Sequence, residues 1–194
     1  MVLAVDGSAS VTYEEFGLIA SGMATALRDE TVTAALAEGS MLTLLLWSGT
    51  GQQDVLTDWT RIASRADLAG FADEVENMPR TVQAGATAIG EALVQALTLL
   101  AKLPAVTKRS IVNVIGDGRS NQGIAPGPIR DRMAQAGITI NGLCILHEEP
   151  DLLQSYTDEV IGGPGAFAVI CREYADFTEA MRQKLLREVT GPTA

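Results

Sequence analysis

Short apolar runs alternate with longer amphipathic stretches along the chain. Five of these runs are typical of buried strands, because each is only a few residues long and ends at polar or turn-forming residues. They cover residues 2–5, 41–47, 110–115, 138–146 and 166–171. A sixth strand is predicted at 55–62. The turn cluster at 48–51 is so short that it predicts an antiparallel hairpin between this strand and the one before it.

The stretches between the runs have apolar residues three or four positions apart, which is typical of helices packed on one side. The clearest case is 87–103, where Ile89, Leu93 and Leu100 share a face. Further helices are predicted at 13–36 with a break near Asp29, and at 63–78, 128–136, 151–160 and 174–189.

The alternation of strands and helices predicts an α/β fold. We expect a doubly wound, mostly parallel six-stranded sheet with one antiparallel edge strand and helices on both faces. Residues 1–190 are expected to form a single domain, followed by a frayed tail at 191–194. In open sheets of this kind, ligands bind beyond the carboxyl ends of the strands. Residues that follow strands therefore carry the most functional information.

Three polar segments lie at or near such positions: 6–10 after the first strand, 85–87 before the central helix, and 116–121 after strand 110–115. Together they offer two carboxylates and three hydroxyls, those of Asp6, Ser8, Ser10, Thr87 and Asp117. Oxygen ligands without sulfur or imidazole suit Mg²⁺, Mn²⁺ or Ca²⁺. The small number of formal charges favours Mg²⁺ with water completing its shell. The sequence therefore predicts a metal site.

Each segment also has a simpler interpretation. The polar side chains of 6–10 can cap a helix that starts near Thr12, and Thr87 can cap the central helix. Asp117 can be an ordinary turn residue. Each alternative is plausible alone. It is not plausible that all three segments carry such residues at element boundaries for unrelated reasons, and this favours the metal site.

The pattern Asp-x-Ser-x-Ser after the first strand, a later Thr, and Asp-Gly-x-Ser after a buried strand resembles the metal-ion-dependent adhesion site of von Willebrand factor type A (vWA) domains. The resemblance extends over nearly the whole chain, because the order of strands, hairpin and helices also agrees. Among such domains, the chain is most similar to a bacterial family with no assigned function. The segments that carry this similarity are 47–49, 87–89, 137–143 and 160–167.

The resemblance implies a role for each residue of the predicted site. Ser8 and Ser10 would bind the metal through their hydroxyls, and Thr87 would do so directly or through water. Asp6 and Asp117 would act mainly through water and orient the serines. A remaining coordination position would accept a carboxylate from a partner protein.

Two positions depart from the commoner family pattern, and neither removes a ligand. Gly116 replaces a Thr or Ser before the second aspartate, and Gly7 stands where a hydrophobic residue is frequent. We expect Asp6 and Asp117 to lie on solvent-facing loops, so that replacing either with alanine removes metal binding and leaves the fold largely intact.

These features predict a non-catalytic, metal-dependent protein-binding module used in adhesion or assembly. One alternative is a phosphotransferase resembling the haloacid dehalogenases, in which Asp6 would be the nucleophile. That reaction needs a general acid two residues later, where this chain has Ser8, and Asn121 stands where the metal loop's last acid is expected. The other alternative is a vWA scaffold subunit whose metal site is unused.

Charge and hydropathy limit the partners. The chain carries 14 basic and 24 acidic residues, a formal net charge of −10, which disfavours nucleic acid and anionic lipid. No apolar run is long enough to cross a bilayer, so membrane insertion is not expected. The chain opens almost inside a strand, and the family resemblance favours an exported bacterial protein whose leader is absent here.

A few further residues carry expectations of their own. Cys144 and Cys171 lie in apolar runs and are expected to be buried free thiols rather than a disulfide. His147 is expected in a solvated rim loop, with a second cation site or a pH-sensitive contact as the alternatives. Arg119 follows the predicted site closely, where it would contact an acidic partner or balance the site's aspartates.

Overall fold

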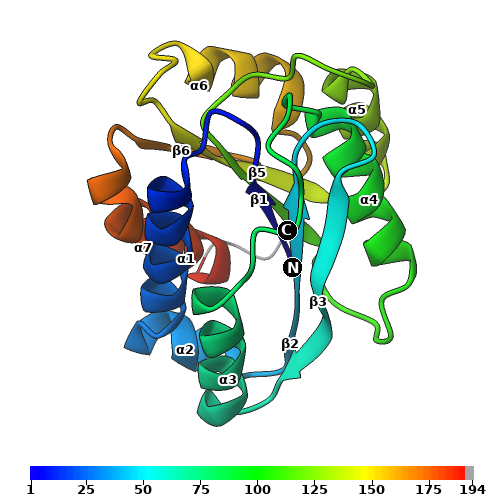
Figure 1. Cartoon of the computed structure of the whole chain (residues 1–194). Helices are drawn as coiled ribbons and strands as arrows, with labels where there is room; N and C mark the ends of the chain where they lie inside the picture. The colour runs from blue at the N-terminus through cyan, green and yellow to red at the C-terminus, as the bar shows by residue number, and fades with distance from the viewer. Residues whose placement is uncertain (191–194) are drawn as a thin grey trace.

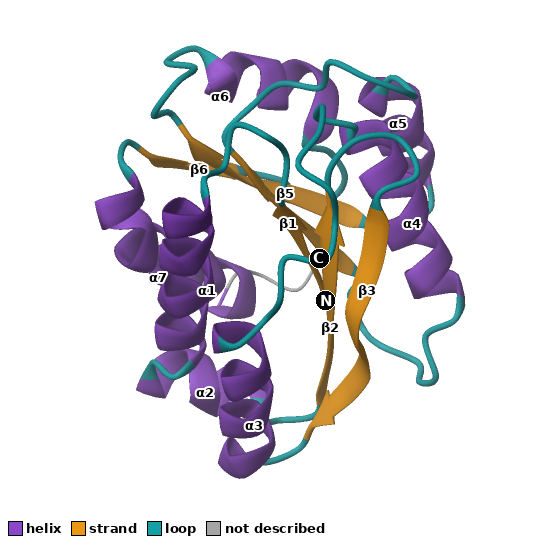
Figure 2. Ribbon diagram, viewed as in Figure 1, coloured by secondary structure: helices purple, strands orange, loops and turns teal. Residues whose placement is uncertain are grey.

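The structure is a computed structural model that describes residues 1–190, so the predicted tail at 191–194 lies outside the described residues. Its centre is a six-stranded sheet in the order β3-β2-β1-β4-β5-β6, shown in Figure 2. The strands are β1 (Val2–Asp6), β2 (Ser40–Trp47), β3 (Gln53–Ile62), β4 (Ile111–Gly116), β5 (Thr139–Ile145) and β6 (Ala168–Cys171). Among the six strands of residues 1–190, only the β2–β3 pairing is antiparallel, which confirms the predicted hairpin and edge strand.

Helices cover both faces of the sheet (Figure 1). One layer contains α1 (Tyr13–Leu27), α2 (Glu30–Leu36), α3 (Arg65–Glu76) and α7 (Phe177–Thr190). The other contains α4 (Ile89–Ala101), α5 (Pro126–Gln135), α6 (Leu152–Ser155) and the π-helical turn η1 (Tyr156–Val160). A short 3₁₀ turn, η2 (Tyr174–Asp176), precedes α7. None of the helices in residues 1–190 is long and apolar enough to cross a membrane.

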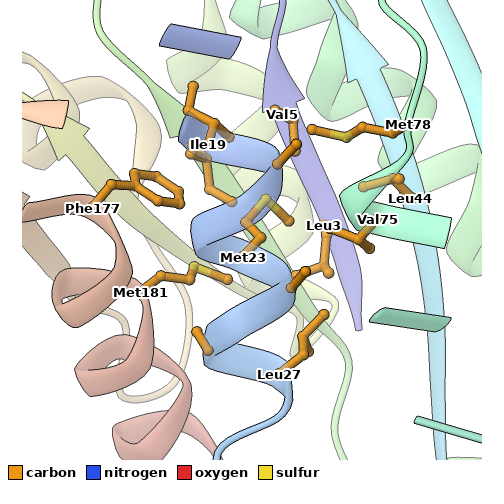
Figure 3. Close-up of a cluster of buried hydrophobic side chains, with 14 of the residues drawn as sticks. Leu3, Val5, Ile19, Met23, Leu27, Leu44, Val75, Met78, Phe177 and Met181 are labelled. Atoms are coloured by element: carbon orange, nitrogen blue, oxygen red, sulfur yellow. The ribbon is translucent and has the colours of Figure 1, made fainter. Parts of the chain in front are cut away.

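The core is divided between the two faces of the sheet because strand side chains alternate in direction. Leu3 and Val5 of β1 belong to the hydrophobic cluster under α1, α3 and α7, while Val2 and Ala4 belong to the cluster under α4 and α5. In the first cluster, Met23 of α1 lies between β1 and α7 (Figure 3). Burial on both faces explains why the strand is a continuous apolar run.

Capping side chains set the bounds of the first two helices. The Thr12 hydroxyl accepts from Glu15 N–H, and the Glu15 carboxylate accepts from Thr12 N–H in return. Asp29 caps α2 and lies at the predicted break. Thr12 therefore caps α1, and the segment 6–10 is not needed for that purpose.

Most remaining differences from the predicted elements are shifts of one to three residues. The predicted helix 151–160 is a four-residue α-helix followed by the π-helical turn η1. The central helix starts at Ile89 with Ala88 as its N-cap and no side-chain cap bond. Thr87 therefore lies in the preceding loop, and its interpretation as a helix cap is wrong. Cys144 and Cys171 are buried and free, as predicted.

A polar cluster lies buried beneath α7. Lys184 donates to the Glu188 carboxylate at 2.5 Å and also contacts the side-chain oxygen of Asn113 on β4. Glu188 accepts in addition from the side-chain amides of Asn113 and Asn141, at 3.1 and 2.7 Å. All four side chains are almost inaccessible to solvent. The charge pair is therefore surrounded by hydrogen-bond partners inside the core, as a buried ion pair requires.

Candidate metal centre

The predicted site residues gather where the loops after β1 and β4 meet. These strands are parallel neighbours, with Ala4 opposite Val114 and Val5 opposite Ile115, so their carboxyl ends lie side by side. The chain continues from β1 to β2 on one side of this point and reaches β4 on the other. Such a position, where the strand order reverses, is the usual ligand site of an open α/β sheet.

Hydrogen bonds connect four of the five predicted ligands. The Ser8 N–H donates to Asp6 Oδ1 at 2.7 Å, and the hydroxyls of Ser8 and Ser10 are 3.1 Å apart. The Ser10 hydroxyl donates to Asp117 Oδ1 at 2.7 Å. The loop after β1 is thus linked side chain to side chain with the loop after β4.

The loop that carries Thr87 joins the same group through its backbone. Thr87 N–H donates to the side chain of Asn121 at 2.8 Å, and Asn121 N–H donates back to Thr87 O at 2.9 Å. On the other side, Ala9 N–H donates to Gly85 O at 2.8 Å. The Thr87 hydroxyl lies 3.6 Å from the point that a Cβ on Gly118 would occupy, directly after Asp117.

Both aspartates are buried, with 0% of Asp6 and 1% of Asp117 exposed to solvent. The expectation that they lie on solvent-facing loops is therefore wrong. The loops that follow β1 and β4 fold over their own strand ends and are hydrogen-bonded to the 85–87 loop. This arrangement shields both carboxylates from solvent. Ser10 is the member of the set that retains partial exposure, whereas Ser8 and Thr87 are buried.

The environment of Asp6 favours its neutral form in the absence of a cation. Burial is the largest cause and proximity to Asp117 the second, and together they raise the pKa of Asp6 from its ordinary value of 3.8 to about 7. Hydrogen bonds from Ser8 and the positive charge of Arg80 act in the opposite direction. An added cation would reverse this balance, because it favours the ionised carboxylate.

Two residues that support the site were not found by sequence reasoning. Arg80 donates to the backbone oxygens of Gly7 and Ser8, at 2.9 and 2.6 Å, and so holds the loop that carries the serines. The Tyr174 hydroxyl donates to Asp117 Oδ2 at 2.9 Å. No local pattern marks either residue, since the contacts span 57 or more positions in the sequence.

The donor set suits an ion that prefers oxygen. Within residues 1–190, no group of three or more His, Cys, Asp and Glu side chains could hold a metal, so any site here depends on hydroxyls as well as carboxylates. One carboxylate oxygen, Asp6 Oδ2, is buried without a hydrogen-bond partner among the described residues. Such an atom is costly unless a water or an ion satisfies it. The residues present therefore fit a hydrated divalent cation.

The rim of the site differs in part from expectation. Arg119 pairs with Glu149 and Asp151, at 2.6 and 2.8 Å, rather than with either buried aspartate. The expectation that it balances the site's aspartates is wrong. His147 is half exposed and lies 2.8 Å from the Glu173 carboxylate, and this hydrogen bond raises the pKa of the imidazole. Its place in a solvated rim loop is as predicted.

Comparison with known families gives a match over nearly the whole chain. A family model described as "Protein of unknown function (DUF1194)" matches residues 1–193. A search of the curated proteins finds no match.

Comparison with solved structures shows the vWA fold. A von Willebrand factor type A protein from Catenulispora acidiphila superposes with a TM-score of 0.66 at 20% identity, over 97% of this chain and 42% of that one. Proximal thread matrix protein 1 of the mussel byssus, with a zinc-occupied MIDAS motif, gives 0.66 at 16% identity over 97% and 47%. The pilus adhesin SpaC from Lactobacillus rhamnosus GG gives 0.70 at 12% over 97% and 30%. The chain spans less than half the length of these proteins.

Proposed function

The chain belongs to the family described as "Protein of unknown function (DUF1194)", and we propose that residues 1–190 act as one metal-dependent protein-binding module. The metal would be held by Ser8, Ser10 and Thr87. Asp6 and Asp117 would act mainly through water and orient the serines. A partner protein would supply a carboxylate to the metal. The vWA fold of the chain supports this proposal.

The observation that carries the proposal is the hydrogen bond from Ser10 Oγ to Asp117 Oδ1. A serine that donates its proton to a carboxylate keeps its lone pairs free for a cation. Hydrogen bonds from a hydroxyl to a carboxylate are shorter and stronger than those between neutral groups. Carboxylates that orient neutral ligands in this way are the usual support of a metal site.

The ligand chemistry favours Mg²⁺, with Mn²⁺ or Ca²⁺ as alternatives. When bound, the ion would act as a Lewis acid toward an incoming carboxylate. Neutral hydroxyls offset little of its charge, so it would bind an anionic group of a partner strongly. That the mussel thread protein has a zinc-occupied MIDAS motif supports a divalent cation in this fold.

We place the function in binding rather than catalysis. Ser8 stands where a phosphotransferase of the haloacid-dehalogenase type needs its general acid, and Asn121 uses its side chain to hold the Thr87 backbone. The solved structures that resemble the chain include a pilus adhesin and a thread matrix protein. They support an exported location, with adhesion or assembly as the role.

Calorimetric titration of the metal-stripped protein with Mg²⁺, Mn²⁺ and Ca²⁺ tests the metal site. The wild type should bind saturably, and Asp117→Ala should lose that binding because Ser10 loses its acceptor. Ser21→Ala is the matched control, since it removes an exposed hydroxyl of α1 that donates to Leu18 O at 3.4 Å. It should leave binding unchanged.

The same titration, repeated with a short peptide carrying a single glutamate, tests the partner chemistry. The peptide should bind in Mg²⁺ and be released by a chelator. If neither the metal nor the peptide with metal binds to the wild type, the module is a scaffold with an unused site and the proposal fails.

A further inference from the structure

Tyr156 is a buried tyrosine whose hydroxyl has no hydrogen-bond partner among residues 1–190. Buried hydroxyls are rarely left in this state, because a buried polar group without a hydrogen bond destabilises the fold. Its position is also unusual, since Tyr156 starts the π-helical turn η1. Single π turns occur frequently at functional sites.

Two glycines on neighbouring strands make room for the Tyr156 ring. A Cβ added to Gly142 of β5 would lie 2.8 Å from the ring carbon Cδ1. A Cβ added to Gly116 of β4 would lie 2.8 Å from the hydroxyl oxygen. Side chains at these positions would therefore displace the ring, and their absence lets the hydroxyl reach the carboxyl end of β4.

The hydroxyl meets the metal site at that point. The Cβ added to Gly116 would also lie 2.8 Å from Asp6 Oδ2, the carboxylate oxygen without a hydrogen-bond partner. Two buried oxygens without hydrogen-bond partners, Tyr156 Oη and Asp6 Oδ2, thus lie next to Gly116. One is a donor, because burial keeps the Tyr156 hydroxyl protonated by raising its pKa, and the other is an acceptor.

We propose that Tyr156 is a positioning residue for Asp6, donating a hydrogen bond to Oδ2 through one water. The inference rests on the proposed metal-binding function. Tyr156 belongs to the core cluster on one face of the sheet and Tyr174 to the cluster on the other. Each buried aspartate would then be oriented by a tyrosine from its own side, Asp117 by Tyr174 and Asp6 by Tyr156.

The variant that tests this is Tyr156→Phe, which removes the hydroxyl and keeps the ring. Loss of one hydrogen bond to a charged group should weaken Mg²⁺ affinity about tenfold in the calorimetric titration. The matched control is Thr43→Val, which removes a buried hydroxyl that donates to Thr57 O at 2.7 Å. Thr43 lies opposite Val2, at the other end of β1, so this variant should lower the melting temperature without changing Mg²⁺ affinity.

Gly116→Ala gives a second measurement. The added methyl group should force the hydroxyl and Asp6 Oδ2 apart and weaken Mg²⁺ affinity. Its effect should be smaller in the Tyr156→Phe background, where one of the two close contacts is gone.

The outcomes distinguish the inference from the function on which it rests. If the wild type and Tyr156→Phe bind Mg²⁺ equally well, the inference is overturned and the proposed function stands. An equal loss from Gly116→Ala in both backgrounds would also overturn it, because the hydroxyl would then not reach Asp6. If the wild type binds Mg²⁺ neither alone nor together with the glutamate peptide, the proposed function fails and the inference with it.

Discussion

Ser10 Oγ lies 2.7 Å from Asp117 Oδ1, although 107 positions separate the two residues in the chain. The contact exists because β1 and β4 are parallel neighbours whose carboxyl ends coincide. It turns two common loop motifs into one connected group of oxygens. The predictions below concern that group and the core that supports it.

Asp6→Asn should stabilise the metal-free protein at pH 8 while weakening Mg²⁺ binding. The ionised Asp6 is buried and is repelled by Asp117, and an amide removes both costs. The rise of the pKa from 3.8 to about 7 corresponds to about 4 kcal/mol, which is the upper limit of the expected gain in the free energy of unfolding. Urea denaturation measures this gain. The control is Asp54→Asn on the exposed edge of β3, where a change within about 0.5 kcal/mol is expected. Destabilisation by Asp6→Asn would mean that the carboxylate is a structural group.

The pH dependence of stability should differ between the metal-free wild type and Asp6→Asn. The folded pKa of Asp6 is raised from 3.8 to about 7, so the folded state holds a proton that the unfolded state has lost. This stabilisation is complete below pH 3.8 and disappears as the pH rises to about 7. The unfolding free energy of the wild type relative to the variant should therefore fall across that interval and level off above it. A constant difference from pH 4.5 to 8.5 would contradict the raised pKa.

Magnesium binding should release a proton below pH 7. The cation requires the ionised carboxylate, so affinity should rise with pH by up to about tenfold per unit and level off above pH 7. Calorimetry in two buffers of different ionisation enthalpy measures the proton directly. The proton release should be absent in Asp6→Asn, and its persistence there would assign the proton to another group.

Breaking the buried ion pair beneath α7 should destabilise the fold and leave the metal site unaffected. Lys184→Met leaves the Glu188 carboxylate buried without its cation, for an expected loss of about 3–5 kcal/mol. The double variant with Glu188→Leu should recover much of that loss, since no charge remains buried. Urea denaturation measures both, and a single variant that is no less stable than the double one would contradict the role of the pair.

Two glycines of α1 provide a matched pair for the packing against α7. A Cβ on Gly22 would lie 2.7 Å from the Phe177 ring, whereas Gly17 has no neighbour within 4 Å. Gly22→Ala should therefore destabilise by about 1–3 kcal/mol, and Gly17→Ala should stabilise by up to about 1 kcal/mol through helix propensity. Thermal unfolding gives both values. Equal shifts in the two variants would mean that α7 does not pack as closely as described.

The sequence predicted the fold well because the relevant patterns are local. Each of the five apolar runs corresponds to a strand, and the predicted hairpin turn joins β2 to β3. The break near Asp29 separates α1 from α2. The errors in the fold lie at boundaries: the central helix is predicted from residue 87 and begins at Ile89. Apolar periodicity records which face is buried, but it does not record which residue ends a helix.

The residues of the candidate site could be named from the sequence, because each follows or precedes a recognisable element and the combination resembles a known motif. The burial of these residues and the charges around them could not be predicted from the sequence. Both aspartates are buried rather than solvent-facing, and Arg80, rather than Arg119, is the cation whose charge acts on Asp6. Burial and charge proximity depend on how distant loops fold over one another.

By itself the sequence determined an α/β sheet with an antiparallel edge and the set of oxygen-bearing side chains at its strand ends. The tertiary structure decided which strands are neighbours, and hence that Ser10 meets Asp117. It also brought Tyr174 and Tyr156 to the two aspartates from opposite faces. The reason is physical: strand and helix periodicities act over a few residues, whereas hydrogen bonds between loops are selected only after the whole sheet has paired and its two core layers have packed.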